Sequence, residues 1–141
     1  TVRRANVTGF RQPENKSLGE FLSHQLARSG QRLGVAIDYH CCLGALLYPW
    51  SFNGPVLSSS ERGRHLAIAQ SMQRHLGTDL KHGTTPNLLG YSAKGTSKDF
   101  YYEHFGALGF TFEGRKGVED RYFNEHTAMW SEIVAAMRPG P

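Results

Sequence analysis

The chain has 141 residues, 39% of them hydrophobic and 20% charged, with a formal net charge of +4 and a sequence pI near 9.3. This composition is ordinary for a globular protein, excludes disordered and fibrous classes, and predicts a single domain over residues 1–141. The basic residues are spread from Arg3 to Arg138, without a basic run interleaved with aromatics, so no nucleic-acid partner is expected. The longest apolar run, Leu43 to Tyr48, is far too short to span a bilayer, so no membrane partner is expected either.

The first forty residues predict a helix followed by a strand. The chain opens without an initiator methionine or an apolar targeting stretch, which is typical of a processed or excised product. Pro13 and Glu14 begin a helix with apolar residues at helical spacing, and Ser29-Gly30 ends it. The run Leu33 to Ile37 then predicts a buried parallel strand that ends at Asp38-Tyr39-His40. Open α/β sheets bind their ligands at such strand ends.

The rest of the chain predicts helices around a second strand. Residues 41–55 are predicted to be a loop, and Ser58 to Glu61 begin a helix that runs to about His75. Gly, Thr and Ser dominate residues 77–97, which predicts a loop with one short strand near Leu88-Leu89. A short helix over 98–105, a strand over 107–115 and a helix over 121–138 complete the order. This order predicts an α/β fold with the sheet in the middle.

Three residues with useful chemistry stand at strand ends or in loops: His40, Tyr91 and Glu113. Each has an ordinary explanation when it is taken alone, as a structural histidine, a packing tyrosine and a solvated glutamate. Glu113 is the exception in one respect, because it ends the apolar run Phe110-Thr111-Phe112, where burial would oppose its ionisation.

The segments around these residues resemble zinc carboxypeptidases of the A/B type. "IDYHCCLGALLYPWS" is similar to the family segment in which a histidine ends a strand and an aliphatic run leads to Tyr-Pro. "YSAKGTSKDFYYEHFGALGFTFEGR" is similar to a later segment, and the 22 positions from Tyr91 to Glu113 (113 minus 91) match the family spacing. "PENKSLGEFL" resembles the family's helix start before that histidine. The resemblance extends from about Gly9 to Trp130 and implies a carboxypeptidase-like α/β/α fold with a mixed, largely parallel sheet, here its C-terminal half.

The resemblance implies a role for each candidate in cutting residues from the C-termini of peptides or proteins. His40 would be one of three protein ligands of a catalytic Zn²⁺, with Asp38 or a backbone carbonyl as a hydrogen-bond partner. Glu113 would act as general base toward the attacking water. Tyr91, on a mobile loop, would close over the substrate and hydrogen-bond to it. Arg115 would help to hold the Glu113 carboxylate or the peptide, or would form a plain surface salt bridge.

Seven residues after the loop tyrosine, the family places the residue at the base of the pocket for the C-terminal side chain, which here is Lys98. A buried ammonium at this place would favour C-terminal Glu or Asp. The alternative is a solvated lysine in a turn. Small pocket walls would be Ala93, Thr96 and Thr111.

The family's first half is missing from the sequence. Family members have a catalytic domain about twice this length, and no His-x-x-Glu pair, which supplies the other zinc ligands, occurs here. We therefore expect an enzyme that is inactive alone and is completed by another chain or segment, in a secreted or periplasmic setting. Two alternatives stay open: a zinc amidase that acts on cell-wall peptides, and a non-catalytic carboxypeptidase-like binding protein.

Overall fold

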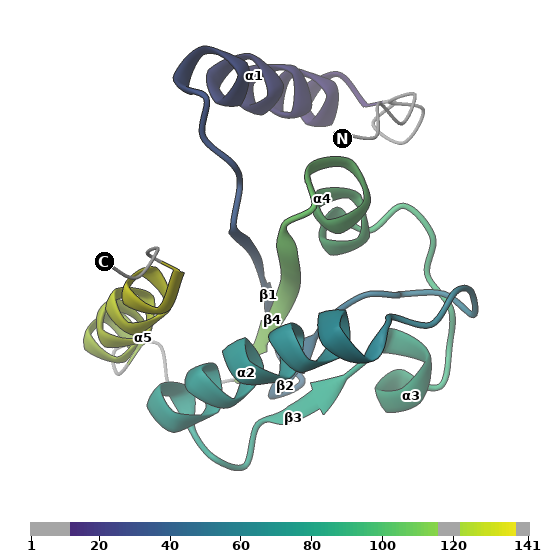
Figure 1. Cartoon of the computed structure of the whole chain (residues 1–141). Coiled ribbons are helices and arrows are strands. Elements are labelled where there is room, and N and C mark those ends of the chain that lie inside the picture. Colours follow the sequence, from purple (N-terminus) through teal and green to yellow (C-terminus); the bar gives the residue numbers. More distant parts are fainter. Residues whose placement is uncertain (1–11, 116–121, 138–141) are drawn as a thin grey trace.

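The computed structural model describes residues 12–115 and 122–137 of the chain, with the side chains of residues 122 and 123 left out of the description. Five helices and four strands lie in these ranges (Figure 1). In chain order they are α1 (Pro13–Ser29), β1 (Val35–Cys41), β2 (Ala45–Leu47), α2 (Ser59–Leu76), β3 (Lys81–Gly83), α3 (Thr85–Leu89), α4 (Ser97–Phe105), β4 (Leu108–Gly114) and α5 (Tyr122–Met137).

The four strands form one mixed sheet in the order β1-β4-β2-β3. β1 runs parallel to β4, β2 runs antiparallel to β4, and β3 runs parallel to β2. This arrangement confirms the predicted fold class, including the parallel pairing of the first strand. The pairing joins residues about seventy positions apart, and Val35 lies opposite Leu108 at its start.

The hydrophobic core lies between one face of the sheet and helices α2 and α5. Leu108, Phe110 and Phe112 alternate along β4 and point to this face, as the period of two requires. The helices and β2 supply most of the other buried side chains, which include Leu46, Ile68, Ala69, Met72, Met129 and Ile133. The intervening β4 residues therefore point to the opposite face, where α4 begins.

Three short elements differ from the sequence-based expectation. The strand expected near Leu88-Leu89 is wrong, because residues 85–89 form helix α3. Thr84 caps this helix by accepting the N–H of Asn87 at 3.4 Å, and Gly90 ends it in the left-handed region at φ 73°. Strands β2 and β3 lie in segments that were expected to be loop, because three-residue strands are stabilised by sheet partners distant in sequence.

The start of α2 follows the expectation closely. The Ser58 hydroxyl accepts the N–H of Glu61 at 3.2 Å, and the Glu61 carboxylate accepts the N–H of Ser58 at 3.1 Å. These two bonds form a capping box, which satisfies two backbone donors that a helix start would otherwise leave free.

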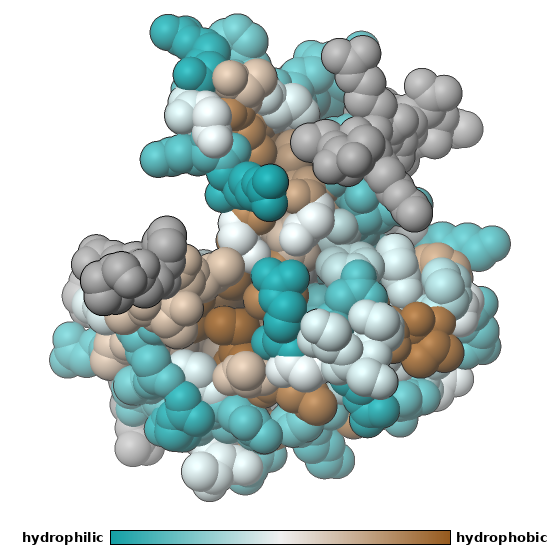
Figure 2. Space-filling view, viewed as in Figure 1, coloured by the Kyte–Doolittle hydropathy of each residue, from teal (hydrophilic) through white to brown (hydrophobic). Residues whose placement is uncertain are grey.

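The strand β1 is less buried than expected and pairs, within the described residues, with β4 alone. Figure 1 shows α1 at the top of the molecule, next to α4 and joined to β1 by an extended segment, and Figure 2 shows hydrophobic side chains at the surface between α1 and α5, where β1 runs. Five large hydrophobic residues of these three elements are exposed: Leu18, Phe21, Tyr39, Val134 and Met137. These five side chains are of the kind that is usually buried, and here they are exposed.

No helix in the described ranges is long and apolar enough to cross a membrane.

The histidine His65 is the most enclosed ionisable ring of the core. Its side chain is fully buried on α2, among the rings of Tyr48, Tyr102 and Phe110 at centroid distances of 5.8, 5.5 and 5.5 Å. Its Nδ1–H donates to the carbonyl oxygen of Glu61 at 2.8 Å, and its Nε2 has no hydrogen-bond partner in the described part of the chain. Burial therefore lowers the pKa of His65 below its ordinary value of 6.5.

This burial predicts a pH-dependent loss of stability. As pH falls below 6.5, the unfolded chain takes up a proton at this histidine while the folded chain resists it, so stability that is present above pH 6.5 is lost. Replacing His65→Phe keeps an aromatic ring and removes the proton site. We expect the substitution to reduce, by up to about 1 kcal/mol, the fall in the free energy of unfolding between about pH 7.5 and 5.5, measured by denaturant titration.

The matched control is His24→Phe, which replaces an exposed histidine of α1. This variant should keep the full pH dependence. If the free energy of unfolding falls equally with pH in the His65→Phe variant and in the parent chain, His65 is not the source of the pH dependence.

Candidate active site

The register of β1 and β4 gathers four polar side chains on the face opposite the hydrophobic core. Asp38 lies opposite Thr111, and His40 lies opposite Glu113. Residues two apart on a strand share a face, and the core-facing side chains of β4 are Phe110 and its alternate neighbours. His40 and Glu113 therefore lie side by side at the carboxyl ends of two parallel strands.

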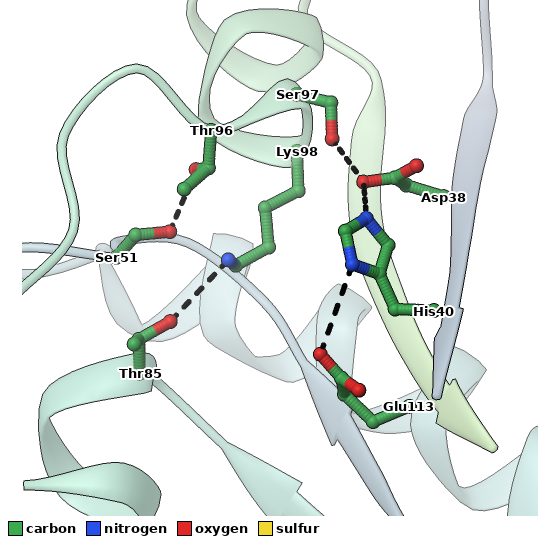
Figure 3. A network of polar contacts seen from close by, with 8 residues as sticks. All are labelled: Asp38, His40, Ser51, Thr85, Thr96, Ser97, Lys98 and Glu113. Atoms are coloured by element: carbon green, nitrogen blue, oxygen red, sulfur yellow. Dashed lines mark hydrogen bonds and ion pairs between the residues drawn. The ribbon is translucent and has the colours of Figure 1, made fainter. Parts of the chain in front are cut away.

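The two ring nitrogens of His40 face different carboxylates (Figure 3). Nε2 lies 3.0 Å from Asp38 Oδ2, within hydrogen-bond distance, whereas Nδ1 lies 4.0 Å from Glu113 Oε1. The His40 side chain is 53% exposed and that of Glu113 only 13%. Nδ1 thus keeps its capacity for another partner, with a largely buried carboxylate beside it.

This chain can offer one ligand to a catalytic zinc ion at this position. A neutral imidazole nitrogen is a donor that suits zinc, and Asp38 on the far side of the ring is the usual kind of support for such a ligand. The described residues contain no group of three or more His, Cys, Asp and Glu side chains that could hold a metal. The donor set therefore fits zinc in kind but is incomplete in number, because such sites take three protein ligands.

The Lys98 side chain is buried, with 2% of its surface exposed. Its ammonium donates to Thr85 Oγ1 at 3.3 Å, as Figure 3 shows, and forms no ion pair within 4.0 Å among the described residues. Burial lowers the pKa of Lys98, and the charges of Asp99, Asp38 and Glu113 partly oppose that shift. Lys98 is thus an enclosed ammonium with donors to spare, not a solvated lysine in a turn.

The start of α4, which carries Lys98, lies directly on β4. A Cβ at Gly109 would be 2.3 Å from the Lys98 carbonyl oxygen, so only glycine permits this approach. Asp99, also buried, accepts the N–H of Ser51 at 2.9 and 3.2 Å through its two oxygens. The helix start is therefore fixed to the sheet on one side and to the loop after β2 on the other.

Two of the expected pocket walls also contact Ser51. Ala93 N–H donates to the Ser51 carbonyl oxygen at 2.7 Å, and Thr96 Oγ1 lies 2.7 Å from Ser51 Oγ. The third expected wall, Thr111, is buried in β4, two residues before Glu113 and on the same face of the strand. The structure thus brings Ala93, Thr96 and Lys98 to one framework around Ser51 and α4.

Two other candidates lie apart from these contacts. Tyr91 follows Gly90, the C-cap of α3, is 55% exposed, and has no hydrogen-bond partner in the described ranges. Arg115 forms an ion pair with Asp79 at 2.5 Å, which corresponds to the surface salt bridge among the alternatives for this residue.

Three residues of this site have no signal in the sequence. Ser97 donates to Asp38 at 2.5 Å, Ser51 joins the loop to α4, and Thr85 accepts from Lys98. Each pairs with a residue at least 13 positions away, and Ser or Thr in a polar loop is too common to single out. Only the structure identifies them.

The comparisons with known proteins concern the family and the fold. A family profile described as zinc carboxypeptidase matches residues 3–136. A search of curated proteins finds no match. Among solved structures, bovine thrombin-activatable fibrinolysis inhibitor in complex with tick carboxypeptidase inhibitor is similar, with a TM-score of 0.63 and 19% identity. A crystal structure of thrombin-activatable fibrinolysis inhibitor gives 0.62 and 22%.

The similarity covers most of this chain but only part of those proteins. The first alignment spans 91% of this chain and 47% of the other chain, and the second spans 89% and 34%. The solved structures, at these identities, support the fold, and the family profile runs over nearly the whole sequence. This chain therefore belongs to the zinc carboxypeptidase family.

Proposed function

We propose that this chain is the C-terminal portion of the catalytic domain of a zinc-dependent exopeptidase that removes C-terminal residues from peptides. The observation that carries the proposal is the pair His40 and Glu113, which face each other across β1 and β4 with Nδ1 and Oε1 4.0 Å apart. A ligand nitrogen and a carboxylate at this separation can both reach one small reactant that lies beside the pair.

In this proposal His40 is a zinc ligand and Glu113 the general base. Zinc, when bound, would supply a Lewis acid that polarises the scissile carbonyl and lowers the pKa of water. Glu113 would accept the proton from the attacking water and pass it to the leaving amine. The low exposure of the Glu113 side chain favours this role. A carboxylate that is shielded from bulk water exchanges protons with the reacting groups beside it and not with the solvent.

The proposal assigns substrate selection to the framework around α4. Lys98 would pair with a C-terminal Glu or Asp side chain, since a buried ammonium with one neutral partner is stabilised by an anionic ligand. Ala93, Thr96 and Thr111 would be the small walls of that pocket. Tyr91 would close over the peptide from its exposed loop, and Arg115, whose pair with Asp79 is at the surface, would have no direct part.

The remaining zinc ligands would come from another chain or segment. The support is the open edge of β1 and the exposed hydrophobic residues of α1, β1 and α5, together with the 47% coverage of the similar structure. The partner segment would cover that surface and bring the two missing ligands to His40.

The metal and the base can be tested separately in the complete domain, formed by this chain and the ligand-supplying segment. That domain should bind stoichiometric zinc, and His40→Ala should abolish it. Glu113→Gln should keep the zinc, measured by metal analysis, and lower kcat for peptide hydrolysis by about 10² to 10⁴, because the proton acceptor is lost.

Glu103→Gln on the exposed face of α4 is the matched control and should leave kcat unchanged. A complete domain without zinc or hydrolysis would favour the non-catalytic binding protein. Zinc-dependent cleavage of cell-wall amides without cleavage of ordinary C-termini would favour the amidase.

A further prediction concerns specificity. The complete domain should prefer a C-terminal Glu over Leu, and Lys98→Met should lower that preference, as a ratio of kcat/KM values, by at least about 30-fold. Methionine keeps the length of the side chain and removes the charge. Lys94→Met in the exposed loop is the control, and a parent enzyme that prefers Leu would overturn the assignment.

A further inference from the structure

The hydrogen bond from Asp38 determines which nitrogen of His40 is free. An ionised carboxylate can only accept, so the ring nitrogen that faces Asp38 Oδ2 at 3.0 Å, Nε2, must carry the hydrogen. In a neutral imidazole the other nitrogen, Nδ1, then has the lone pair. Nδ1 is the nitrogen on the side of Glu113, at 4.0 Å from its Oε1, which is too long for a direct hydrogen bond.

Asp38 is itself held from a second element of the fold. The Ser97 hydroxyl donates to the same oxygen, Asp38 Oδ2, at 2.5 Å (Figure 3). An isolated His–Asp pair at this exposure, 53% and 31% for the two side chains, would be mobile and weakly populated. A second bond, from a separate helix, limits the rotamers of Asp38 and, through it, the orientation of the His40 ring.

Ser97 can serve this purpose because the start of α4 is immobilised. Lys98 follows Ser97 in the chain, and its backbone lies directly on β4 because Gly109 has no side chain there. Asp99 takes the N–H of Ser51 on the other side. The chain Ser97–Asp38–His40 therefore begins at a fixed point in the fold and ends at the nitrogen beside Glu113.

We propose that Ser97 and Asp38 are positioning residues that hold His40 with the hydrogen on Nε2 and the lone pair of Nδ1 directed to the metal site. Outer partners of this kind orient a ligand and raise its basicity. The identity of the metal as zinc rests on the proposed function, whereas the orientation of His40 does not.

The first test needs no metal. In the metal-free complete domain, ¹⁵N shifts of the His40 ring at alkaline pH, where imidazole carries one proton, should show hydrogen on Nε2 and a lone pair on Nδ1. Asp38→Ala should give a mixture of both forms. A ring with its hydrogen on Nδ1 in the parent, or a ring unchanged in Asp38→Ala, would overturn the proposal.

The second test measures zinc affinity by competition with a chromophoric chelator. Asp38→Ala should weaken zinc binding by about 10- to 100-fold. Asp38→Asn, which still accepts from Nε2–H and keeps the shape, should weaken it less and guards against misfolding of the alanine variant. Ser97→Ala should act in the same direction as Asp38→Ala, and Ser97→Thr, which retains the hydroxyl, should restore parental affinity.

Ser131→Ala is the matched control, since its hydroxyl bonds to a carbonyl within α5. Parental zinc affinity in both Asp38→Ala and Ser97→Ala would refute the positioning role. A parent domain that binds no zinc refutes the proposed function instead, and the ring shifts then still decide whether Asp38 and Ser97 set the state of His40.

Discussion

The parallel pairing of β1 with β4 is the constraint on which the candidate site depends. It puts His40 opposite Glu113 and Asp38 opposite Thr111, on the face that the core does not use. A slip of one residue in this register would move one set of side chains to the wrong face, because the side-chain period of a strand is two. The burial of Phe110 and Phe112 against α2 and α5 therefore fixes the position of Glu113, although neither residue takes part in the chemistry.

On the face of the sheet opposite the core, some polar side chains have most of their hydrogen-bonding groups paired, and others can still bind a further partner. Within the described residues, Asp99 is bonded to Ser51 through both oxygens, and Asp38 accepts from two side chains. Lys98 has one neutral hydrogen-bond partner, and Glu113 has one neighbour at 4.0 Å. Burial of a charge is unfavourable unless it is paired, so these two groups are the ones that a ligand would stabilise most. They carry opposite charges, so a ligand that contacts both would need a different group for each.

The sequence predicted the elements whose signals are local. The helix start at Ser58 is confirmed because a capping box is encoded within four residues, and the parallel strands are confirmed because their apolar runs are long enough to recognise. Strands β2 and β3 were missed because a run of three residues is too short to show a periodic pattern. Helix α3 was mistaken for a strand because the apolar pair Leu88-Leu89 was given more weight than the capping residues Thr84 and Gly90. His40 and Glu113 could be found through a resemblance that spans both segments. Ser97 could not, because its partner lies 59 positions away and only tertiary packing brings them together.

In the described part of the chain, the free edge of β1 and the single candidate ligand His40 lie on the same strand. The core between the sheet and the α2–α5 pair is closed, with Phe110 and Met129 fully buried, so the described residues have an interior of their own. The exposed hydrophobic residues lie instead on α1, β1 and α5, around the strand that carries His40. A strand added at the free edge would lie about 4.8 Å from β1, and one of its ends would be next to His40. Under the proposed function, a segment that covers this hydrophobic surface would also have to reach across the end of β1, because the free nitrogen Nδ1 of His40 faces Glu113 on β4.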